Sequence, residues 1–149
     1  MNSISIKKFH ESAILPSRQT EGSAGYDLHV CLPEGKSELL LQPKELALVP
    51  TGIGIELPMG FEAQIRPRSG LSTKNKIILI NSPGTIDSDY RGQIFVPLMN
   101  LSETEFSITA EMRIAQLVVA RYEVFTWQLV NELSETGRGS GGFGSSGSH

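Results

Sequence analysis

The richest group of chemically active side chains lies in residues 84–92. Two carboxylates, a phenol and a guanidinium stand there between two glycines, and an apolar segment, 93–99, follows directly. Asp87 could orient a water molecule and accept its proton, provided that the two lie within hydrogen-bonding distance. An aspartate in such a turn could instead cap its own backbone. The flanking Ile86 and Tyr90 weaken this structural alternative, because a purely structural turn seldom needs an aromatic side chain.

Two more residues of this segment have competing interpretations. Tyr90 could be an ordinary core aromatic, or it could stack beneath a sugar ring and leave no room for an additional hydroxyl group. Taken alone, a tyrosine favours the core. For Asp89 we expect a structural role, in an ion pair with a nearby cation such as Arg91.

Phosphate chemistry is suggested by segment 67–70 (Pro-Arg-Ser-Gly), which follows a predicted strand. The Arg68 guanidinium offers a fork of donors that matches phosphate oxygens. Ser69 adds a hydroxyl group, and Gly70 lets backbone N–H groups approach an anion closely. A polar turn with a helix cap would use the same residue types, and on this segment alone that alternative is narrowly favoured.

Two polar residues need partners that the sequence does not name. Asp27, in segment 24–28 (Ala-Gly-Tyr-Asp-Leu), begins a predicted strand. It could hold a metal-bound water, orient an arginine or, as is commonest for a lone aspartate, cap a turn. Gln116 interrupts the apolar segment 114–120, and a buried amide must find hydrogen-bond partners. Those partners could be structural, or they could be a ligand or its water.

The C-terminal segment 137–147 contains six glycines in eleven residues. Such a chain cannot pack a core, and we expect it to be mobile without a ligand. An expression linker would look similar, especially at 144–149, yet linkers seldom contain residues such as Arg138 and Phe143. A glycine loop with one cation and one aromatic ring could close over a ligand. It is not a Walker loop, since it lacks a Lys-Ser or Lys-Thr pair.

Composition limits the class of protein. At 149 residues, with 39% hydrophobic and 19% charged residues, the chain suits one ordinary globular domain with a real core. The net charge of -3 argues against a general nucleic-acid or membrane binder. The lone Cys31 excludes an internal disulfide and a cysteine zinc site. Because no signal-peptide pattern and no apolar run near ~20 residues is visible, we expect a cytoplasmic location.

The hydrophobic pattern predicts short strands separated by turns that contain Gly and Pro. Alternation is clearest at 53–57 and 61–66, whereas 114–120 predicts a strand covered on both faces. Only 71–76 favours a helical turn. Strands at this spacing indicate an antiparallel sandwich or barrel. The predicted strands are 4–9, 26–30, 46–49, 51–57, 61–66, 77–80, 93–100, 106–108, 114–122 and, last, 125–130.

Taken together and in this order, five segments resemble the trimeric deoxyuridine triphosphatase (dUTPase) family over essentially the full chain. They are 24–28, 67–72 (Pro-Arg-Ser-Gly-Leu-Ser), 84–92, 113–116 (Arg-Ile-Ala-Gln) and 137–147. Pro83 and Thr85 depart from the family's usual pattern, which puts side-chain roles there in question without affecting Asp87. The resemblance implies an all-β, distorted jelly-roll or β-clip type barrel of short antiparallel strands, assembling as a homotrimer. Residues 1–133 would form this domain, and 134–149 a flexible glycine-rich arm that closes over the active site.

The resemblance also implies a dUTP diphosphatase, which hydrolyses dUTP to dUMP and pyrophosphate with Mg²⁺. Such an enzyme keeps uracil out of DNA and supplies dUMP for dTMP synthesis. Each of its three sites would be assembled from all three subunits. Asp87 would orient the water that attacks the α-phosphorus, and Tyr90 would pack on the deoxyribose and exclude ribose. The uracil edge would be read at Asn81, Thr85, Ile86 and Phe95.

The triphosphate would be bound by residues from two subunits and the arm. Arg138 would clasp the γ-phosphate while Phe143 covers the uracil, and Asp27 would contact Mg²⁺ through a water. No nucleic-acid or membrane partner is implied. The full set of implied phosphate-binding residues is Arg68, Ser69 and Gly70 from a neighbouring subunit, Gln116, and the arm residues Arg138, Gly139, Ser140 and Gly141.

Two other functions fit the same fold. The dCTP deaminase relatives release ammonia from cytosine, but neither 67–72 nor 84–92 contains a suitably placed Glu. A non-catalytic nucleotide-binding trimer would also keep the fold. The presence of Asp87, Tyr90, Arg138 and Phe143 argues against a decayed site.

Overall fold

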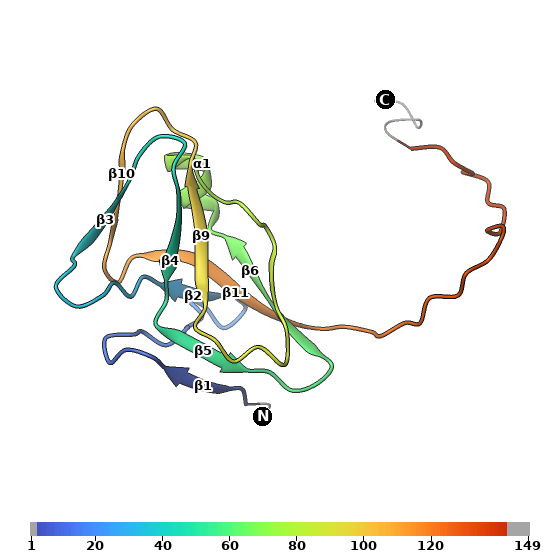
Figure 1. The fold of residues 1–149 in the computed structure, drawn as a ribbon, viewed down its shortest axis with the longest axis horizontal. Coiled ribbons are helices and arrows are strands. Elements are labelled where there is room, and N and C mark those ends of the chain that lie inside the picture. The colour runs from blue at the N-terminus through green and yellow to red at the C-terminus, as the bar shows by residue number, and fades with distance from the viewer. Residues whose placement is uncertain (1–2, 143–149) are drawn as a thin grey trace.

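A computed structural model of the chain describes residues 3–142. Within this range the fold consists of short strands and one helix, and all strand pairs are antiparallel (Figure 1). The predicted all-β architecture is confirmed. The elements are β1 (Ser5–Lys8), β2 (Tyr26–His29), β3 (Glu38–Leu41), β4 (Leu46–Pro50), β5 (Ile53–Glu56), β6 (Phe61–Pro67), α1 (Ser69–Asn75), β7 (Ile77–Leu79), β8 (Gly84–Ile86), β9 (Phe95–Asn100), β10 (Phe106–Thr109) and β11 (Arg113–Arg121).

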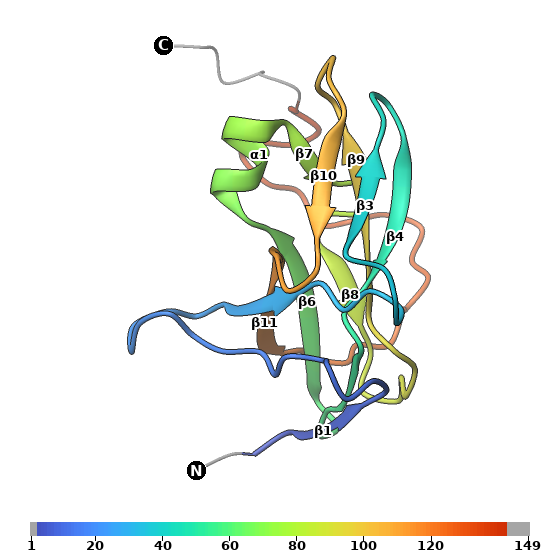
Figure 2. The same ribbon diagram turned by 90° about the vertical axis from the view of Figure 1, so that its left-hand side faces the viewer.

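Strands that are far apart in the sequence form two main sheets. The larger sheet has the order β2-β11-β6-β8, and the smaller has the order β4-β9-β7. Two further sheets, β1-β5 and β10-β3, contain two strands each. β11 is paired on both edges, so its backbone is satisfied within the sheet. Of the strand predicted to be covered on both faces, Ile114, Ala115 and Leu117 are buried, and the other residues of 114–120 are half-buried. Figure 2 shows α1 at the end of β6 that is remote from β1.

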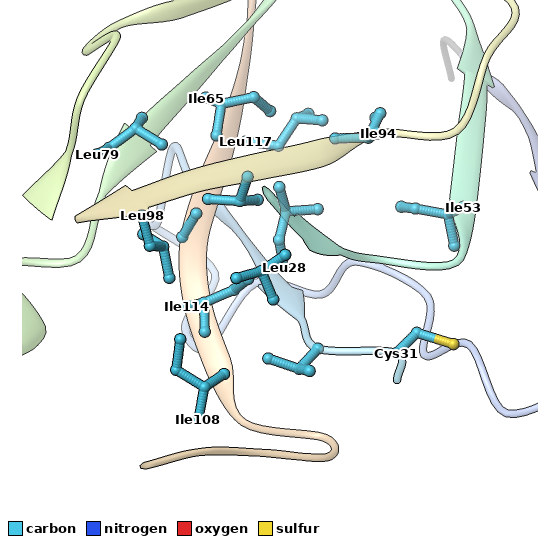
Figure 3. Packing of buried hydrophobic residues seen from close by; sticks show 14 of the residues in the cluster. Leu28, Cys31, Ile53, Ile65, Leu79, Ile94, Leu98, Ile108, Ile114 and Leu117 are labelled. Carbon is cyan, nitrogen blue, oxygen red and sulfur yellow. The ribbon is translucent and has the colours of Figure 1, made fainter. Parts of the chain in front are cut away.

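Alternate side chains of these sheets fill one hydrophobic core (Figure 3). In β9 the buried Val96, Leu98 and Asn100 alternate with partly exposed residues, as a strand covered on one face requires. Asn100 is 0% exposed, and its amide nitrogen donates to two main-chain carbonyls at 2.9 and 2.8 Å. This buried polar group is therefore satisfied. The labelled core residues of Figure 3 include Leu28, Ile53, Ile65, Leu79, Ile94, Ile108, Ile114 and Leu117.

The single helix of the described chain, α1, starts directly after β6 ends, with Arg68 as its N-cap residue. It begins two residues before the predicted helical turn at 71–76. The helix ends at Lys76, whose φ of 56° places it in the left-handed region, and the Lys76 N–H caps the last turn. No residue of α1 is buried and no side chain caps its start. It is held by the strands on both sides of it and by Leu71, which packs against the core, so residues 68–70 stay at the end of the sheet.

The outward face of the smaller sheet is apolar, and several of its side chains are exposed among residues 3–142. Directly opposed residues share a face, and Leu46 pairs with Met99, Leu48 with Pro97, and Pro50 with Phe95. Leu48 is 64% exposed. We call this surface the β9 outer face, defined by Leu46, Leu48, Ile78, Ile80, Phe95, Pro97 and Met99.

After β11 the chain leaves the body as an extended arm, residues 122–142 (Figure 1). The predicted strand at 125–130 is wrong, because this segment finds no pairing strand among the described residues and a lone strand cannot satisfy its backbone. Trp127 and Leu129 are both 99% exposed. The extended segment already begins at residue 122. The predicted division into a domain of residues 1–133 and an arm of residues 134–149 stays a prediction. No helix in residues 3–142 is long and apolar enough to cross a membrane.

Candidate active site

Four of the predicted phosphate-binding residues line one cavity. Arg68, Ser69 and Gly70 stand where β6 passes into α1, and Gln116 projects from the middle of β11. Together with Asp27 they line a cavity of about 660 Å³. Residues separated by almost fifty positions in sequence meet here because β11 is the direct neighbour of both β2 and β6.

Asp27 organises the cations of this cavity. One carboxylate oxygen lies 3.0 Å from Nε of Arg68, and the other lies 3.1 Å from Nη1 of Arg113. Asp27 is 7% exposed, so its charge depends on these two partners. Of the three roles considered for Asp27, orienting an arginine is the one that its contacts match. The turn-cap interpretation is wrong, because among the described residues the Asp27 side chain is bound by guanidinium groups and by no turn N–H.

Arg113 is a member of this cluster that the sequence reasoning did not single out as a site residue. It opens β11 opposite His29, and the strand register shifts between Arg113 and Ala115. Such a bulge re-aims a side chain. Here the Arg113 guanidinium reaches the carboxylate of Asp27. Its position at the start of segment 113–116 was the only sequence signal for this role.

Gln116 is held in place from two sides. Its Nε2 donates to the carbonyl oxygen of Pro67 at 2.9 Å. On the other side, its amide oxygen lies so close to Gly25 that a Cβ at position 25 would overlap it. The glycine of segment 24–28 is thus required by close approach. One partner of this part-buried amide is structural, and the side chain still lines the cavity.

His29 lies behind the cation cluster. Burial lowers the pKa of His29 below its ordinary value, with Arg113 and Arg68 adding to the decrease and Asp27 opposing it. Its Nδ1 is a buried atom without a hydrogen-bond partner. The imidazole is consequently neutral near pH 7 and adds no further positive charge to the two guanidinium groups.

The turn that carries Asp87 connects β8 to β9. The Tyr90 N–H donates to the Asp87 carbonyl at 3.2 Å and closes the turn. The Tyr90 hydroxyl donates to the Gln93 carbonyl at 2.8 Å, and its ring lies so close to Gly92 that any Cβ there would overlap it. Asp87 and Tyr90 are both exposed. Tyr90 is thus not a core residue.

The expected ion pair between Asp89 and Arg91 is wrong. Arg91 instead lies 3.2 Å from Glu56 on β5. Its other nitrogen donates to the main-chain carbonyls of Ser88 and Tyr90 at 2.7 and 3.0 Å. Arg91 therefore binds the carboxylate of Glu56 and two main-chain carbonyls of the turn instead of the carboxylate of Asp89.

The four predicted uracil-reading positions lie on either side of the same turn in the sequence. Thr85 and Ile86 belong to β8, where Ile86 pairs with Ala63 of β6. The Asn81 amide lies against the backbone of Gly84, and Phe95 begins β9 with its side chain exposed. Three of the four thus lie on the segment between β7 and β9 that contains the Asp87 turn, and Phe95 is the first residue of β9.

Within one chain the Asp87 turn and the Arg68 cavity are separate. Ala63, the register partner of Ile86, precedes Arg68 by five residues on β6, a span of roughly 17 Å at about 3.3 Å per residue. Neither Asp87 nor Tyr90 lines the cavity. A single chain thus presents two half-sites, one basic and one carrying the carboxylate.

The remaining predicted residues belong to the arm. Arg138 Nε donates to the Gly141 carbonyl at 2.7 Å, and the Gly139 N–H lies 3.1 Å from the Thr136 hydroxyl. Ser140 lies in the same exposed turn. Phe143 is outside the described residues. None of the described arm residues 122–142 lines the Arg68 cavity.

An antiparallel all-β fold with a phosphate-suited cavity defines a class of protein rather than one family, and comparison with known proteins narrows it. The model of the dUTPase family matches residues 11–147. The deoxyuridine 5'-triphosphate nucleotidohydrolase of Orientia tsutsugamushi (strain Boryong) is 53% identical over 142 residues, covering 95% of this chain and 94% of the relative. The protein of the same name from Leptospira interrogans (strain Fiocruz L1-130) is 50% identical over 145 residues, covering 97% and 98%.

Solved structures agree with the sequence relatives. The dUTPase of Staphylococcus bacteriophage 80alpha, solved with dUPNHPP, has a TM-score of 0.90 and 26% identity, covering 99% of both chains. This chain belongs to the dUTPase family. The predicted family, jelly-roll type fold and hydrolase class are thereby confirmed.

Proposed function

We propose that this chain hydrolyses dUTP to dUMP and pyrophosphate, with Mg²⁺, in a homotrimer whose active sites are shared between subunits. The observation that carries the proposal is the pair of half-sites, which are complementary in chemistry and separated within one chain. Family membership supplies the substrate class. We also place the reaction in the cytoplasm, where the single cysteine, Cys31, would stay reduced.

The Arg68 cavity is the proposed phosphate site. A protein with a net charge of -3 needs local cations to bind a triphosphate. Arg68 supplies a forked donor, Ser69 a hydroxyl and Gly70 an accessible N–H. Asp27 fixes the direction of the Arg68 guanidinium through its 3.0 Å contact. Gln116 presents its amide beside them and contacts a phosphate or its water.

The Asp87 carboxylate is the proposed base. It accepts a proton from water while the water oxygen forms a bond to the α-phosphorus. The bond from the α-phosphorus to the oxygen that bridges to the β-phosphate breaks, and pyrophosphate leaves with that oxygen. Asp87 is exposed, so water and substrate can reach its carboxylate.

The residues around the Asp87 turn form the proposed nucleoside site. Tyr90 packs on the deoxyribose, and its ring, fixed over Gly92, leaves no partner for a 2'-hydroxyl. Sterics are needed here, since an apolar pocket rejects an added hydroxyl only by about 10²-fold. Cytosine would reverse a donor and an acceptor and leave groups unpaired at roughly 1–3 kcal/mol each. The proposed uracil-reading residues are Asn81, Thr85, Ile86 and Phe95.

Assembly of three copies would join the half-sites. The β9 outer face is an apolar surface on strands that come before and after the Asp87 turn, and such surfaces mark protein interfaces. The exposed side chains of Phe125, Trp127 and Leu129 on the arm support contact with another copy for the same reason. A neighbour's Arg68 cavity could then face the Asp87 turn across the interface.

The arm is proposed to complete the site. Its glycines would place N–H groups on the γ-phosphate, and Arg138 would clasp that phosphate with its charge. Phe143, beyond the described residues, would cover the uracil. The proposed arm ligands are Arg138, Gly139, Ser140, Gly141 and Phe143.

The side chains fit a metal that arrives with the substrate. Among residues 3–142 no cluster of three or more His, Cys, Asp or Glu could hold a metal ion. Mg²⁺ prefers phosphate and water oxygens to an all-protein cage, and when bound it neutralises charge on the phosphates. Asp27 would contact it through a water, sharing its carboxylate with Arg68 and Arg113.

Pyrophosphate release from dUTP, compared with dCTP, dTTP and UTP with and without Mg²⁺, tests this function. We expect rapid release of pyrophosphate from dUTP but not from the other three nucleotides, and only when Mg²⁺ is present. Ammonia release from dCTP would instead support the deaminase alternative. Tight dUTP binding without any turnover would support a non-catalytic nucleotide-binding trimer.

A further inference from the structure

The side chain of Arg91 binds main-chain carbonyls inside the turn that begins at Asp87. Its Nη1 donates to the carbonyl oxygens of Ser88 at 2.7 Å and Tyr90 at 3.0 Å. Its Nη2 donates to a carboxylate oxygen of Glu56 at 3.2 Å. Glu56 ends β5, which belongs to a different sheet. One guanidinium therefore connects two carbonyls of the turn, both after Asp87, to a separate element of the body.

These contacts suit a positioning role better than a stabilising one. The Arg91 and Glu56 side chains are 52% and 58% exposed, and exposed ion pairs contribute little to stability. Arginine, however, holds its donors in a rigid plane, so one group can bind several acceptors in fixed directions. One of the two carbonyls that it binds belongs to Ser88, directly after Asp87, and the other belongs to Tyr90 itself.

Other contacts anchor the segment that follows the Asp87 turn, and the contacts of Arg91 hold the turn itself. The Ile94 N–H donates to the Ile53 carbonyl on β5 at 2.8 Å. Closer to the turn, the Tyr90 hydroxyl bonds Gln93 at 2.8 Å. At the turn itself, the Tyr90 N–H donates to the Asp87 carbonyl at 3.2 Å. The Arg91 guanidinium supplies the additional constraint there.

We propose that Arg91, oriented by Glu56, is a positioning residue that fixes the Asp87 carboxylate and the Tyr90 ring relative to each other. The inference rests on the proposed hydrolysis of dUTP. Misplacing a reacting group by about 1 Å can cost about 10²-fold in rate. A looser turn should therefore slow the chemical step, and it should also relax the exclusion of ribose by Tyr90.

The test compares Arg91→Gln, Arg91→Lys, Glu56→Gln and the double variant Glu56→Gln/Arg91→Gln. We expect Arg91→Gln to lower kcat by about 10- to 100-fold with little change in KM, and to lower the dUTP-to-UTP ratio of kcat/KM. Arg91→Lys keeps the charge but not the fork, so it should resemble Arg91→Gln. The double variant should be no worse than Arg91→Gln, because Glu56 acts through Arg91.

Two further measurements keep the outcomes distinct. Amide hydrogen exchange without substrate should speed up in 87–94 in Arg91→Gln, with the rest of the body unchanged. Arg18→Gln is the matched control, since Arg18 is an exposed arginine that donates to the carbonyl of Glu21 at 2.8 Å in another loop. It should leave rate, selectivity and exchange of 87–94 unaltered.

Three results would overturn the role of Arg91. One is unchanged kcat and unchanged sugar selectivity in Arg91→Gln, even if its Tm falls. The others are full activity in Arg91→Lys and independent, multiplicative losses in the double variant. A wild-type protein that does not hydrolyse dUTP would instead contradict the proposed function, and the exchange experiment would still test the contacts of Arg91.

Discussion

Gly25 lies directly against the side-chain amide of Gln116, with no space for a Cβ. We expect Gly25→Ala to displace Gln116 from the Pro67 carbonyl, costing about 1–3 kcal/mol of stability through overpacking. The misplaced amide should lower kcat/KM for dUTP by about 10- to 100-fold. Denaturant unfolding and steady-state kinetics measure the two effects. Gly22→Ala is the control, since nothing lies within 4 Å of a Cβ at position 22; equal behaviour of both variants would refute the packing argument.

Asp87 provides the sharpest test of the chemistry at the residue scale. Asp87→Asn keeps the size and one acceptor oxygen but removes the base, so turnover should fall by about 10²–10⁴-fold while dUTP still binds. Pyrophosphate release and calorimetric titration with dUTP separate the two properties. Asp89→Asn serves as the neighbouring control and should retain activity. Full turnover in Asp87→Asn would remove the water-orienting role.

The family resemblance, rather than residue types alone, predicted which side chains would share the cavity, and neither predicted how they are held. Arg68 and Gln116 meet as expected. The pairing of Asp27 with Arg113 needed a register shift, and that of Arg91 with Glu56 needed a strand 35 residues away. Such long-range partners depend on topology, which local pattern does not specify.

At the scale of elements, Asp27 ties three strands of the larger sheet. It sits on β2 and binds Arg68 after β6 and Arg113 on β11. Asp27→Asn leaves two guanidinium groups without their carboxylate, and partial exposure of both limits the cost to about 1–2 kcal/mol. We expect Tm to fall and KM for dUTP to rise by about tenfold, as Arg68 loses its direction.

Arg113→Gln is the informative partner of that variant. It removes one guanidinium but leaves Asp27 paired with Arg68, so its effect on KM should be clearly smaller. Thermal unfolding and initial-rate kinetics provide both values. If Asp27→Asn bound dUTP as tightly as the wild type, Arg68 would not depend on Asp27 for its position.

Strand prediction succeeded where alternation was long and failed where it was short. β6 and β9 follow their predicted ranges closely, since one face of each is buried. β3 was missed because Glu38–Leu41 has no period of two, and β8 because its three residues were interpreted as part of a turn. The segment at 125–130 has strand-like alternation, but a strand needs a partner, and none of residues 3–142 pairs with it.

At the scale of the whole molecule, the β9 outer face predicts how copies assemble. Leu48→Glu would place a charge at the centre of this apolar surface, and burying it would cost several kcal/mol. We expect the molar mass in light scattering to fall from three chains toward one, and hydrolysis to fall with it because the half-sites separate. Leu40→Glu, on an exposed leucine of β3, should keep the assembly. A trimeric Leu48→Glu protein would place the interface elsewhere.

Removal of 137–149 separates the arm's role in catalysis from its role in assembly. The core lies entirely before residue 122, so we expect the shortened protein to fold and assemble as the full chain does. The single tryptophan, Trp127, remains in it, and its fluorescence reports whether the first part of the arm keeps its environment. Turnover of dUTP should fall by about 10²-fold or more, because the proposed phosphate clasp is lost. Removal of 144–149 alone should change nothing, and normal turnover without 137–149 would make the segment a mere linker.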